Sequence, residues 1–393
     1  MVYSENLKAF YLFMLVLKRR LKKMSGAGYL KLSREALCRY LSSLYGGDVE
    51  VCEVWRLGEE KPKVTDLKGF GYGFSYAVEF RFGGEIRRVV FETMRPEGFG
   101  HEHFSDRAQI LLWQNSVFNK LPRHVHSVDV GAFAEGGECL KSLGKCNELF
   151  ILTEFVDGKL YHLDLDRIKE TERLSELDEK RCLALSDYLV EIHKVKHEGP
   201  GLYVRRIREL VGHGECITGL LDSYPTNLSF VNQSYLVGVE CDCVVWRWRL
   251  KEKVHRLSQV HGDFHPWNVL FREGTDFTVL DRSRGEWGEP ADDVACMTMN
   301  YIFYSLQKYG ELGGVFEHLF RLFWDNYLRK TGDSEILEAV QPFYAWRGLV
   351  MASPIWYPNL SVDVRVKLLK FAKSVLQFEQ FDLSSVNSYV RSC

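Results

Sequence analysis

The sequence has no C-x-x-C pair, although it contains ten cysteines, and only Cys241 and Cys243 lie close together. This spacing speaks against a zinc ribbon and against a dense disulfide framework. The N-terminus also lacks the order of charges followed by an apolar stretch that a secretory signal shows. We therefore expect free thiols and a cytoplasmic location.

A charge excess of one sign is missing too, because 51 Lys and Arg residues against 53 Asp and Glu residues give a formal net charge of −2. A dedicated nucleic-acid binder usually has a strong basic excess, so no nucleic-acid partner is expected. A hydrophobic content of 46% and a charged content of 26% are those of an ordinary globular protein. The length of 393 residues suffices for two lobes or domains, whereas the oligomeric state is not indicated.

The sequence contains no apolar run long enough to span a bilayer, so no transmembrane segment is predicted. AFYLFMLVL (9–17) is too short, and KRRLKK (18–23) follows it instead of preceding it. We predict an amphipathic helix here, with weak membrane-surface contact as the alternative. LSREALCRYLSSLYGG (32–47) is typical of a second helix that starts at Ser33 and stops at two glycines. Residues 1–47 are thus a predicted helical extension.

Residues 48–157 are rich in predicted strands. DVEVCEVWRL (48–57) alternates as a strand does, and residues 67–94 indicate a Gly-rich turn, a strand, a Gly83-Gly84 hairpin and another strand. A helix is expected over residues 101–121. ELFILTEFVDG (148–158) then predicts a buried strand that ends in an acidic turn, a natural hinge.

Residues 158–393 are predicted to be mainly helical. DEKRCLALSDYLVEIHKV (178–195) has helical spacing of its apolar residues, and residues 291–393 are mostly helical with a break at ASPIWYPNL (352–360). Residues 234–257 stay ambiguous, because their length favours a helix while VVWRWRL alternates like a strand.

VHGDFHPWNVLF (260–271) places Asp263 and Asn268 between apolar flanks typical of short strands, and FTVLD (277–281) is a second short strand that ends at Asp281. Two neighbouring strands joined by the turn REGTD would bring the three polar side chains to one edge. A carboxylate and an amide oxygen suit a hard cation such as Mg²⁺. The sequence therefore predicts a metal site there, with Asp263 left to hold an acceptor hydroxyl.

HGDFHPWN followed by VLD resembles the signature of aminoglycoside phosphotransferases and choline kinases, which are small-molecule relatives of protein kinases. GEPADDVA (288–295) resembles the Gly-x-Pro…Asp segment that follows in that family. The resemblance covers about residues 48–300. It implies an α+β bilobal protein-kinase-like fold with a small antiparallel-sheet N-lobe (48–157) and a large, mainly helical C-lobe (158–393).

The resemblance also implies roles for individual residues. Asp263 would orient the acceptor hydroxyl and take its proton, while Asn268 and Asp281 would hold Mg²⁺ on the nucleotide phosphates. Asp293 would brace the catalytic loop, and His261 is expected to shape that loop by hydrogen bonding. An Asp with an ordinary pKa of about 3.9 suffices as a base, because phosphoryl transfer has a loose transition state and the proton leaves late.

Nucleotide binding would use main-chain groups at two places. The glycines of the GFGYG hairpin would let backbone N–H groups approach the phosphates: Gly69, Gly71 and Gly73. The hinge would offer one carbonyl and one N–H group to an adenine edge through the backbone of Glu154, Phe155 and Val156. The expected cofactors are ATP (or GTP) and Mg²⁺.

A lysine that the family normally carries on its third strand is missing. It would reach the nucleotide phosphates and pair with a helix carboxylate, yet no lysine occurs between Lys68 and Lys120. RRVVFETMRP (87–96) holds Glu92 or Thr93 at the expected position. An anion there would repel phosphate.

Three explanations of this departure compete. Arg88 or Arg95 would supply the cation from a shifted register, or the ion pair would be reversed, with Glu92 facing Arg107 on the following helix. Alternatively, the protein is a catalytically silent pseudokinase that acts as a nucleotide-binding or protein-interaction module. Because the three polar residues of the catalytic segment are all present, an active enzyme is favoured.

The phosphate acceptor is the least defined part. Choline kinases bind a quaternary ammonium through aromatic cages, and Trp356 and Tyr357, near the proline break, are candidates for the substrate pocket. An aminoglycoside would want clustered carboxylates, which no tract shows clearly. The sequence therefore predicts a Mg²⁺-dependent kinase that transfers the γ-phosphate of ATP (or GTP) to a hydroxyl of a small molecule.

Overall fold

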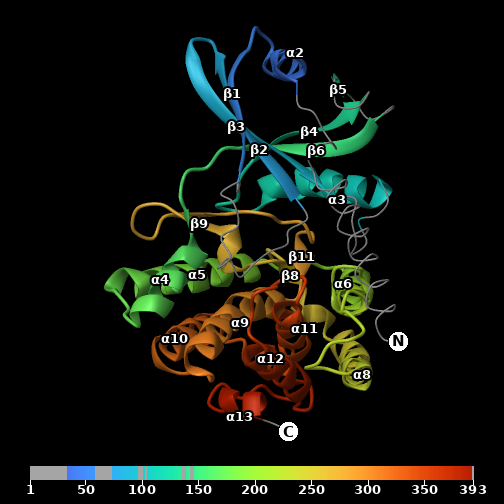
Figure 1. Cartoon of the computed structure of the whole chain (residues 1–393), viewed down its shortest axis with the longest axis vertical. Coiled ribbons are helices and arrows are strands. Elements are labelled where there is room, and N and C mark those ends of the chain that lie inside the picture. The colour runs from blue at the N-terminus through green and yellow to red at the C-terminus, as the bar shows by residue number, and fades with distance from the viewer. Residues whose placement is uncertain are drawn as a thin grey trace, which may run out of the picture.

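The computed structural model describes residues 33–57, 73–95, 101, 104–134, 139–141 and 146–391. Over these ranges the chain forms two lobes, a smaller one built on an antiparallel sheet and a larger helical one (Figure 1). The predicted fold class and bilobal arrangement are therefore confirmed. The amphipathic helix predicted within residues 1–23 lies outside the described residues.

The smaller lobe contains a six-stranded sheet in the order β1-β2-β3-β6-β4-β5, with antiparallel neighbours throughout. Its strands are β1 (Glu50–Arg56), β2 (Gly73–Phe82), β3 (Glu85–Met94), β4 (Ser127–Ala134), β5 (Cys139–Lys141) and β6 (Cys146–Glu154). Gly83 and Gly84 join β2 to β3 with φ of 59° and 84°. Two consecutive positive φ values are what a two-residue hairpin turn of type I′ requires, so the predicted hairpin is confirmed.

Two helices cover opposite faces of this sheet: α2 (Arg34–Tyr45) and α3 (Phe104–Val117). Phe91 of β3 belongs to the cluster around α2, whereas Ile151 of β6 belongs to the cluster around α3. Because successive strand residues face opposite sides, Glu92 points away from α2 and toward the side on which the larger lobe lies. Ser33 caps α2 through a hydrogen bond from Ala36 N to its Oγ, at the predicted start.

The larger lobe consists of helices and a few short strands. Its helices are α4 (Tyr161–Thr171), α5 (Glu176–His193), α6 (Pro200–Gly212), α7 (Ile217–Asp222), α8 (Gln233–Leu250), α9 (Pro290–Tyr309), α10 (Gly314–Thr331), α11 (Gln341–Ala352), α12 (Val362–Val375) and α13 (Val386–Arg391). Its short strands are β7 (Lys159–Leu160), β8 (Ser258–Gln259), β9 (Val269–Phe271), β10 (Phe277–Val279) and β11 (Trp287–Gly288). The predicted break in the C-terminal helical region is confirmed, since α11 ends and α12 begins on either side of it.

Helix α9 lies at the centre of the larger lobe, and every residue from Pro290 to Leu306 is buried. Helices α5, α10 and α11 pack around it (Figure 1). A helix that is buried on all sides has little freedom to shift, so polar groups at its first turn are held in fixed positions.

Helix α8 resolves the ambiguity of residues 234–257. Its buried residues Val239, Cys243, Trp246 and Leu250 recur at intervals of three and four, which is helical spacing. Asn232 caps the helix by accepting a hydrogen bond from Tyr235 N. The alternation in VVWRWRL is therefore not a strand signal.

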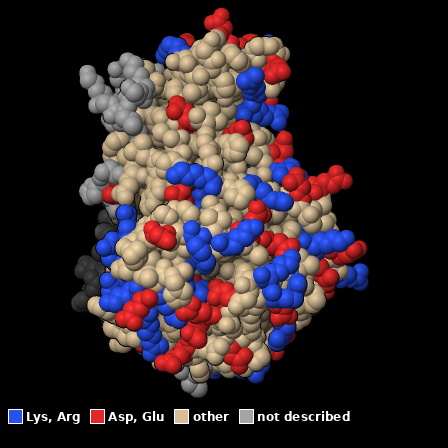
Figure 2. Space-filling model, turned by 180° about the vertical axis from the view of Figure 1, so that it is seen from behind, with Lys and Arg blue, Asp and Glu red and all other residues tan. Residues whose placement is uncertain are grey.

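The surface fits the near-neutral composition. On the face shown in Figure 2, basic and acidic side chains are intermingled over the larger lobe. None of the helices in the described part of the chain is both long enough and apolar enough to span a membrane. The eight cysteines whose side chains are described are free thiols: Cys38, Cys52, Cys139, Cys182, Cys216, Cys241, Cys243 and Cys296.

Candidate active site

The HGD sequence forms a turn that follows β8. Gly262 has a φ of 87°, and a Cβ atom at this position would lie 3.1 Å from Cβ of Arg284. A positive φ and a close neighbour together explain why glycine stands here. The turn directs Asp263 into a cavity that residues of both lobes line.

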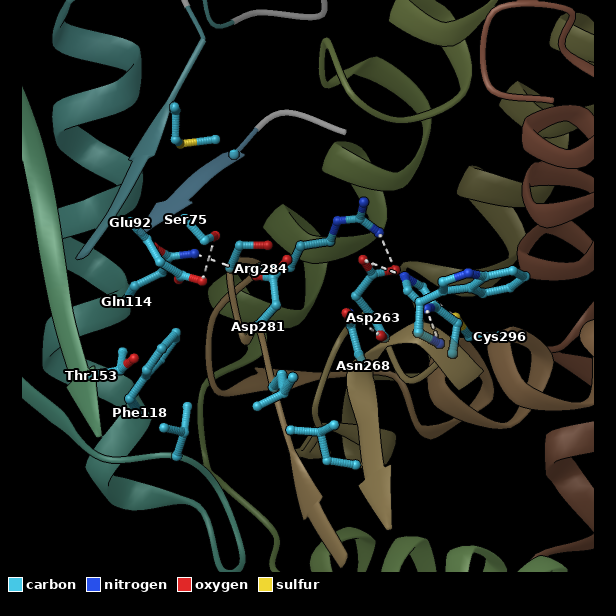
Figure 3. A pocket seen from close by; sticks show the side chains of 18 of the residues that line it. Ser75, Glu92, Gln114, Phe118, Thr153, Asp263, Asn268, Asp281, Arg284 and Cys296 are labelled. Atoms are coloured by element: carbon cyan, nitrogen blue, oxygen red, sulfur yellow. Dashed lines mark hydrogen bonds and ion pairs between the residues drawn. The ribbon is translucent and has the colours of Figure 1, made fainter. Parts of the chain in front are cut away.

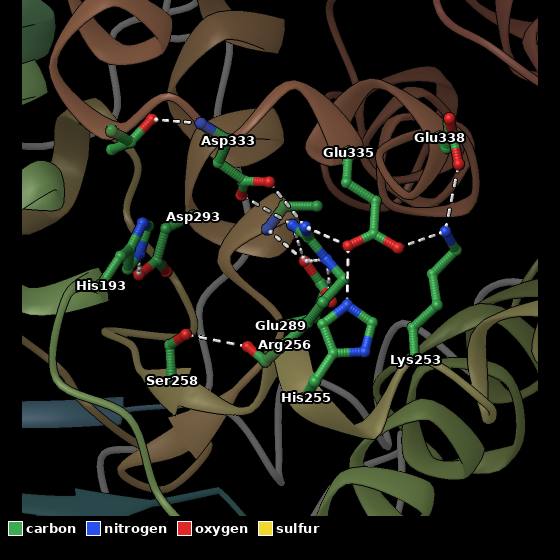
Figure 4. A network of polar contacts seen from close by, with 12 residues as sticks. His193, Lys253, His255, Arg256, Ser258, Glu289, Asp293, Asp333, Glu335 and Glu338 are labelled. Atoms are coloured by element: carbon green, nitrogen blue, oxygen red, sulfur yellow. Dashed lines mark hydrogen bonds and ion pairs between the residues drawn. The ribbon is translucent and has the colours of Figure 1, made fainter.

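Asp293, in the first turn of α9, anchors the backbone of the HGD turn. Its Oδ2 accepts a hydrogen bond from His261 N at 2.7 Å, and its Oδ1 accepts one from Gly262 N at 2.7 Å. His193 Nε2 lies 3.1 Å from Oδ2 (Figure 4). Burial alone would raise the pKa of the Asp293 carboxyl, but the contacts with His193 and His261 outweigh it and lower that pKa. Asp293 is thus a charged anchor of the loop backbone.

His261 also contributes to the loop. Its Nδ1 accepts a hydrogen bond from Asp263 N at 3.3 Å. Burial lowers the pKa of the His261 imidazole to about 4, so the ring is neutral near pH 7 and Nδ1 is available as an acceptor. The arrangement fits the loop-shaping role expected of His261.

Neighbouring strands bring the other two polar residues together, as the sequence predicted. β9 and β10 are antiparallel, with Val269 opposite Val279. One step further along, Leu280 N donates to Asn268 O at 2.8 Å. Asn268 and Asp281 therefore emerge at the same end of the strand pair, next to Asp263 (Figure 3).

The orientation of both side chains suits a cation. Asn268 Nδ2 donates to Asp263 O at 3.0 Å, which leaves Asn268 Oδ1 as the outward acceptor. Asp281 has a φ of 55°, a left-handed conformation that Asp tolerates better than most residues and that is common at functional sites. A carboxylate and an amide oxygen form a donor set that fits Mg²⁺.

These two residues would supply only part of a coordination sphere. Among the described residues, no group of three or more His, Cys, Asp or Glu side chains could hold a metal ion. Mg²⁺ commonly takes one or two protein ligands and completes its octahedron with substrate phosphates and water. The donor set of Asn268 and Asp281 thus fits a metal ion that arrives with a nucleotide, and it does not fit a permanently caged ion.

The cavity between the lobes has a volume of about 460 Å³. The predicted site residues that line it are Gly73, Glu154, Phe155, Val156, Asp263, Asn268, Asp281, Trp356 and Tyr357. Gly69 and Gly71 lie outside the described residues. Residues from four distant segments of the sequence therefore meet at one site.

Glu92 also lines this cavity, at the place where the lysine was expected. Its Oε1 accepts a hydrogen bond from Ser75 Oγ at 3.2 Å (Figure 3). Burial, together with the negative charge of Asp281, raises the pKa of Glu92 to about 7. The carboxyl group is consequently about half protonated near pH 7, which reduces its repulsion of phosphate.

The ion pair proposed between Glu92 and Arg107 is wrong. Within the described residues Glu92 is bonded to Ser75, while the buried Arg107 donates from Nη1 to His101 O at 2.6 Å. The α3 residue that approaches Asp281 is instead Gln114, whose Nε2 lies 3.4 Å from Asp281 Oδ1. A neutral amide can approach the Asp281 carboxylate without the cost of burying another charge.

The explanation by a shifted register is not supported either. Arg88 pairs with Glu79 at 2.9 Å on the exposed surface. The guanidinium of Arg95 lies over the ring of Phe74 at 4.5 Å. Neither arginine is among the described residues that line the cavity.

Two arginines lie beside Asp263, the residue predicted to hold the acceptor hydroxyl, and they were not foreseen from the sequence. We call the group of Asp263, Arg284, Asp292 and Arg347 the acceptor side. Arg347 Nη1 lies 2.6 Å from Asp263 Oδ1, and its Nη2 lies 2.9 Å from Asp292 Oδ1. Arg284 Nη1 lies 3.5 Å from the same oxygen of Asp263. Burial alone would raise the pKa of Asp263, but the charges of Arg284, His265 and Arg347 hold it well below its usual range. Asp263 is therefore ionised near pH 7.

The comparisons with known proteins agree with this site. Residues 121–312 match the phosphotransferase enzyme family. The matched segment contains the hinge, Asp263, Asn268, Asp281 and Asp293, so the resemblance seen in the sequence is confirmed. None of the curated proteins compared with the chain matches it.

The chain is also similar to solved structures of kinases, at low sequence identity. Amicoumacin kinase with AMP-PNP, Ca²⁺ and its ligand is 13% identical over 97% of this chain and 99% of that one, with a TM-score of 0.48. A thermostable aminoglycoside phosphotransferase with AMP-PNP and hygromycin B is 18% identical over 91% of this chain and 99% of that one, with a TM-score of 0.46. Choline kinase from Cryptosporidium parvum is 13% identical over 88% of this chain and 86% of that one, with a TM-score of 0.43.

Proposed function

We propose that this protein is a Mg²⁺-dependent small-molecule kinase that transfers the γ-phosphate of ATP (or GTP) to a hydroxyl group. The observation that carries the proposal is the meeting of Asp263, Asn268 and Asp281 with the hinge residues in one cavity. The match of residues 121–312 to the phosphotransferase enzyme family supports the same reaction class.

The cavity suits a nucleotide at its hinge end. Val90 from the smaller lobe and Leu270 and Leu280 from the larger lobe line it, and apolar side chains on both sides favour a planar base. The backbone of residues 154–156 would bind the edge of that base. The phosphates would then extend toward Asn268 and Asp281.

The metal ion, when bound with the nucleotide, would neutralise phosphate charge and hold the γ-phosphoryl group in line. The chain's own contribution is positioning. Asn268 Oδ1 and the Asp281 carboxylate would fix the ion, while the Asp263 carboxylate would accept a hydrogen bond from the acceptor hydroxyl and orient its oxygen.

In the transfer step the acceptor oxygen forms a bond to the γ-phosphorus, and the bond from that phosphorus to the β–γ bridging oxygen breaks. The nucleoside diphosphate leaves with the electron pair of the broken bond, and the hydroxyl proton passes to Asp263 late in the step. An ionised Asp263 with a low pKa is a weak base, so orientation rather than basicity is its main contribution.

The alternative is a catalytically silent nucleotide-binding or protein-interaction module. Glu92 at the expected lysine position favours it, because a partial negative charge opposes phosphate. The test is release of ADP from ATP, measured over a panel of hydroxyl compounds with wild-type protein and with Asp263→Asn and Asp281→Asn. Turnover that both substitutions abolish supports the kinase. Nucleotide binding without transfer to any acceptor class supports the module.

A further inference from the structure

We infer that Arg347 and Arg284 form an anion-binding subsite next to Asp263, so that the acceptor carries a carboxylate or phosphate group beside its reactive hydroxyl. The inference rests on the proposed function for its reaction. It goes beyond that function by assigning a chemical class to the acceptor.

The first argument is the convergence of two guanidinium groups. The Cζ atoms of Arg284 and Arg347 lie 4.3 Å and 3.9 Å from the centroid of the Trp346 ring, and both side chains reach Asp263 Oδ1. Two guanidinium groups so close to each other repel, and this repulsion has to be offset by anions or by the face of an aromatic ring. Figure 3 shows Arg284 beside Asp263 in the cavity.

The second argument is the set of hydrogen-bond donors that these residues leave unused. The Nε atoms of Arg284 and Arg347 and the Nε1 atom of Trp346 are buried, and no described residue accepts a hydrogen bond from them. All three residues line the cavity. Buried donors without acceptors are costly, so a cluster of three donors indicates a ligand that brings acceptors.

The third argument is that the carboxylates of the acceptor side are already engaged. Asp263 and Asp292 pair with Arg347 at 2.6 Å and 2.9 Å. Glu215, which also lines the cavity, has its pKa raised to about 7 by burial and therefore carries only part of a negative charge near pH 7. A cationic acceptor would have to displace Arg347 from its partners, whereas an anionic acceptor would find two cations with donors to spare.

Guanidinium geometry selects the ligand group. Arginine presents parallel N–H donors that match the two oxygens of a carboxylate or of a phosphate. Asn300, which is also buried in this wall, offers an unpartnered Oδ1 that would accept a hydrogen bond from a neutral polar group of the same ligand. A small hydroxy acid or a phosphorylated polyol combines these features.

The experiment compares matched pairs of hydroxyl compounds. Hydroxycarboxylic acids are paired with their primary amides, and sugar phosphates are paired with the free sugars, so the two arms separate a carboxylate from a phosphate. Binding is measured by titration calorimetry in the presence of Mg²⁺ and ADP, and transfer is measured as ADP release from ATP. The proteins are wild type, Arg347→Gln, Arg347→Lys and, as an exposed control on α10, Arg321→Gln.

We expect at least one anionic compound to bind roughly 10- to 100-fold more tightly than its neutral partner. Arg347→Gln should remove this preference, Arg347→Lys should restore part of it, and Arg321→Gln should leave it unchanged. Thermal unfolding of each variant is recorded alongside, and Arg347→Lys keeps the test informative if Arg347→Gln does not fold.

The outcomes separate the inference from the proposed function. Transfer to neutral or cationic acceptors in preference to anionic ones overturns the inference and leaves the kinase standing. Anion binding that depends on Arg347 but gives no transfer supports the subsite and counts against the kinase. Anion binding that is absent, or equal in wild type and Arg347→Gln, overturns the inference in either case.

Discussion

Asp293 fixes the backbone of Gly262 through a 2.7 Å hydrogen bond from Gly262 N to Asp293 Oδ1. The same carboxylate accepts a second backbone hydrogen bond, from His261, so one buried side chain orients two consecutive peptide groups. The residue after them is Asp263. A carboxylate at the start of a largely buried helix thus determines where the proposed catalytic group points.

We predict that Asp293→Asn lowers the free energy of unfolding by about 2–3 kcal/mol. An amide has one acceptor oxygen, so one of the two backbone N–H groups would lose its charged partner. Urea denaturation at pH 7 measures the loss, and Asp325→Asn, an exposed position on α10, is the control with an expected change below about 0.5 kcal/mol.

This loss should depend on pH. Because the folded protein lowers the pKa of Asp293, the stabilisation is present above the ordinary Asp pKa of about 3.9 and disappears as the pH falls through the lower folded value. The difference between wild type and Asp293→Asn should therefore shrink between pH 5 and pH 3. An undiminished difference at pH 3 would show that the two backbone hydrogen bonds do not need the ionised carboxylate.

For Asp263→Asn we expect turnover to fall about 10²- to 10⁴-fold. The amide can neither take the proton nor form an ion pair with Arg347. Both the orientation of the hydroxyl and the charge balance of the acceptor side are therefore lost. Nucleotide affinity should change by less than threefold, because the proposed nucleotide contacts lie elsewhere. Steady-state kinetics and nucleotide titration check the two parts, and a large loss of nucleotide affinity would move Asp263 into the nucleotide site.

Magnesium dependence tests Asp281. Chelation of divalent cations should abolish turnover, and Asp281→Asn should raise the Mg²⁺ concentration needed for half-maximal turnover roughly 10- to 100-fold. Asp276→Asn is the matched control, since Asp276 lies in the turn between β9 and β10 and pairs with Arg272 at the surface. An equal effect of both substitutions would indicate general damage to the strand pair and would argue against a metal ligand.

The meeting of Asp263, Asn268 and Asp281, the proposed catalytic segment, was predictable because its information is local. Asp263, Asn268 and Asp281 lie within 19 consecutive residues, and the two short strands around them can be recognised from apolar flanks. The hinge and the Gly83-Gly84 turn were accessible for the same reason, since alternation and paired glycines are short-range signals.

The acceptor side was not predictable, because its contacts join distant positions. Arg347 is 84 residues from Asp263 in the sequence, and nothing near position 347 marks its arginine as facing a carboxylate. Arg284 lies close after Asp281 in the sequence, which is a weak signal. Only the fold shows that its side chain approaches Asp263. The Glu92–Arg107 pair failed because matching charges on adjacent elements do not determine which side chains meet, and Ser75 and His101 provided nearer partners.

The last prediction concerns Glu92, whose pKa of about 7 lies above the ordinary Glu value. A raised carboxyl pKa means that the folded state binds the proton more tightly than the unfolded state does. The contribution of Glu92 to stability is therefore largest below pH 4, decreases as the pH rises to about 7, and is constant above that.

Glu92→Gln keeps an acceptor for Ser75 and removes the titration. It should match wild type at pH 4 and be more stable by about 1–3 kcal/mol at pH 8, as measured by urea denaturation without nucleotide or metal. Glu50→Gln, at an exposed position of β1, is the control variant. A Glu92→Gln protein that is less stable than wild type at pH 8 would mean that the ionised carboxylate has a cationic partner, and the reduced-repulsion account of the lysine position would then be wrong.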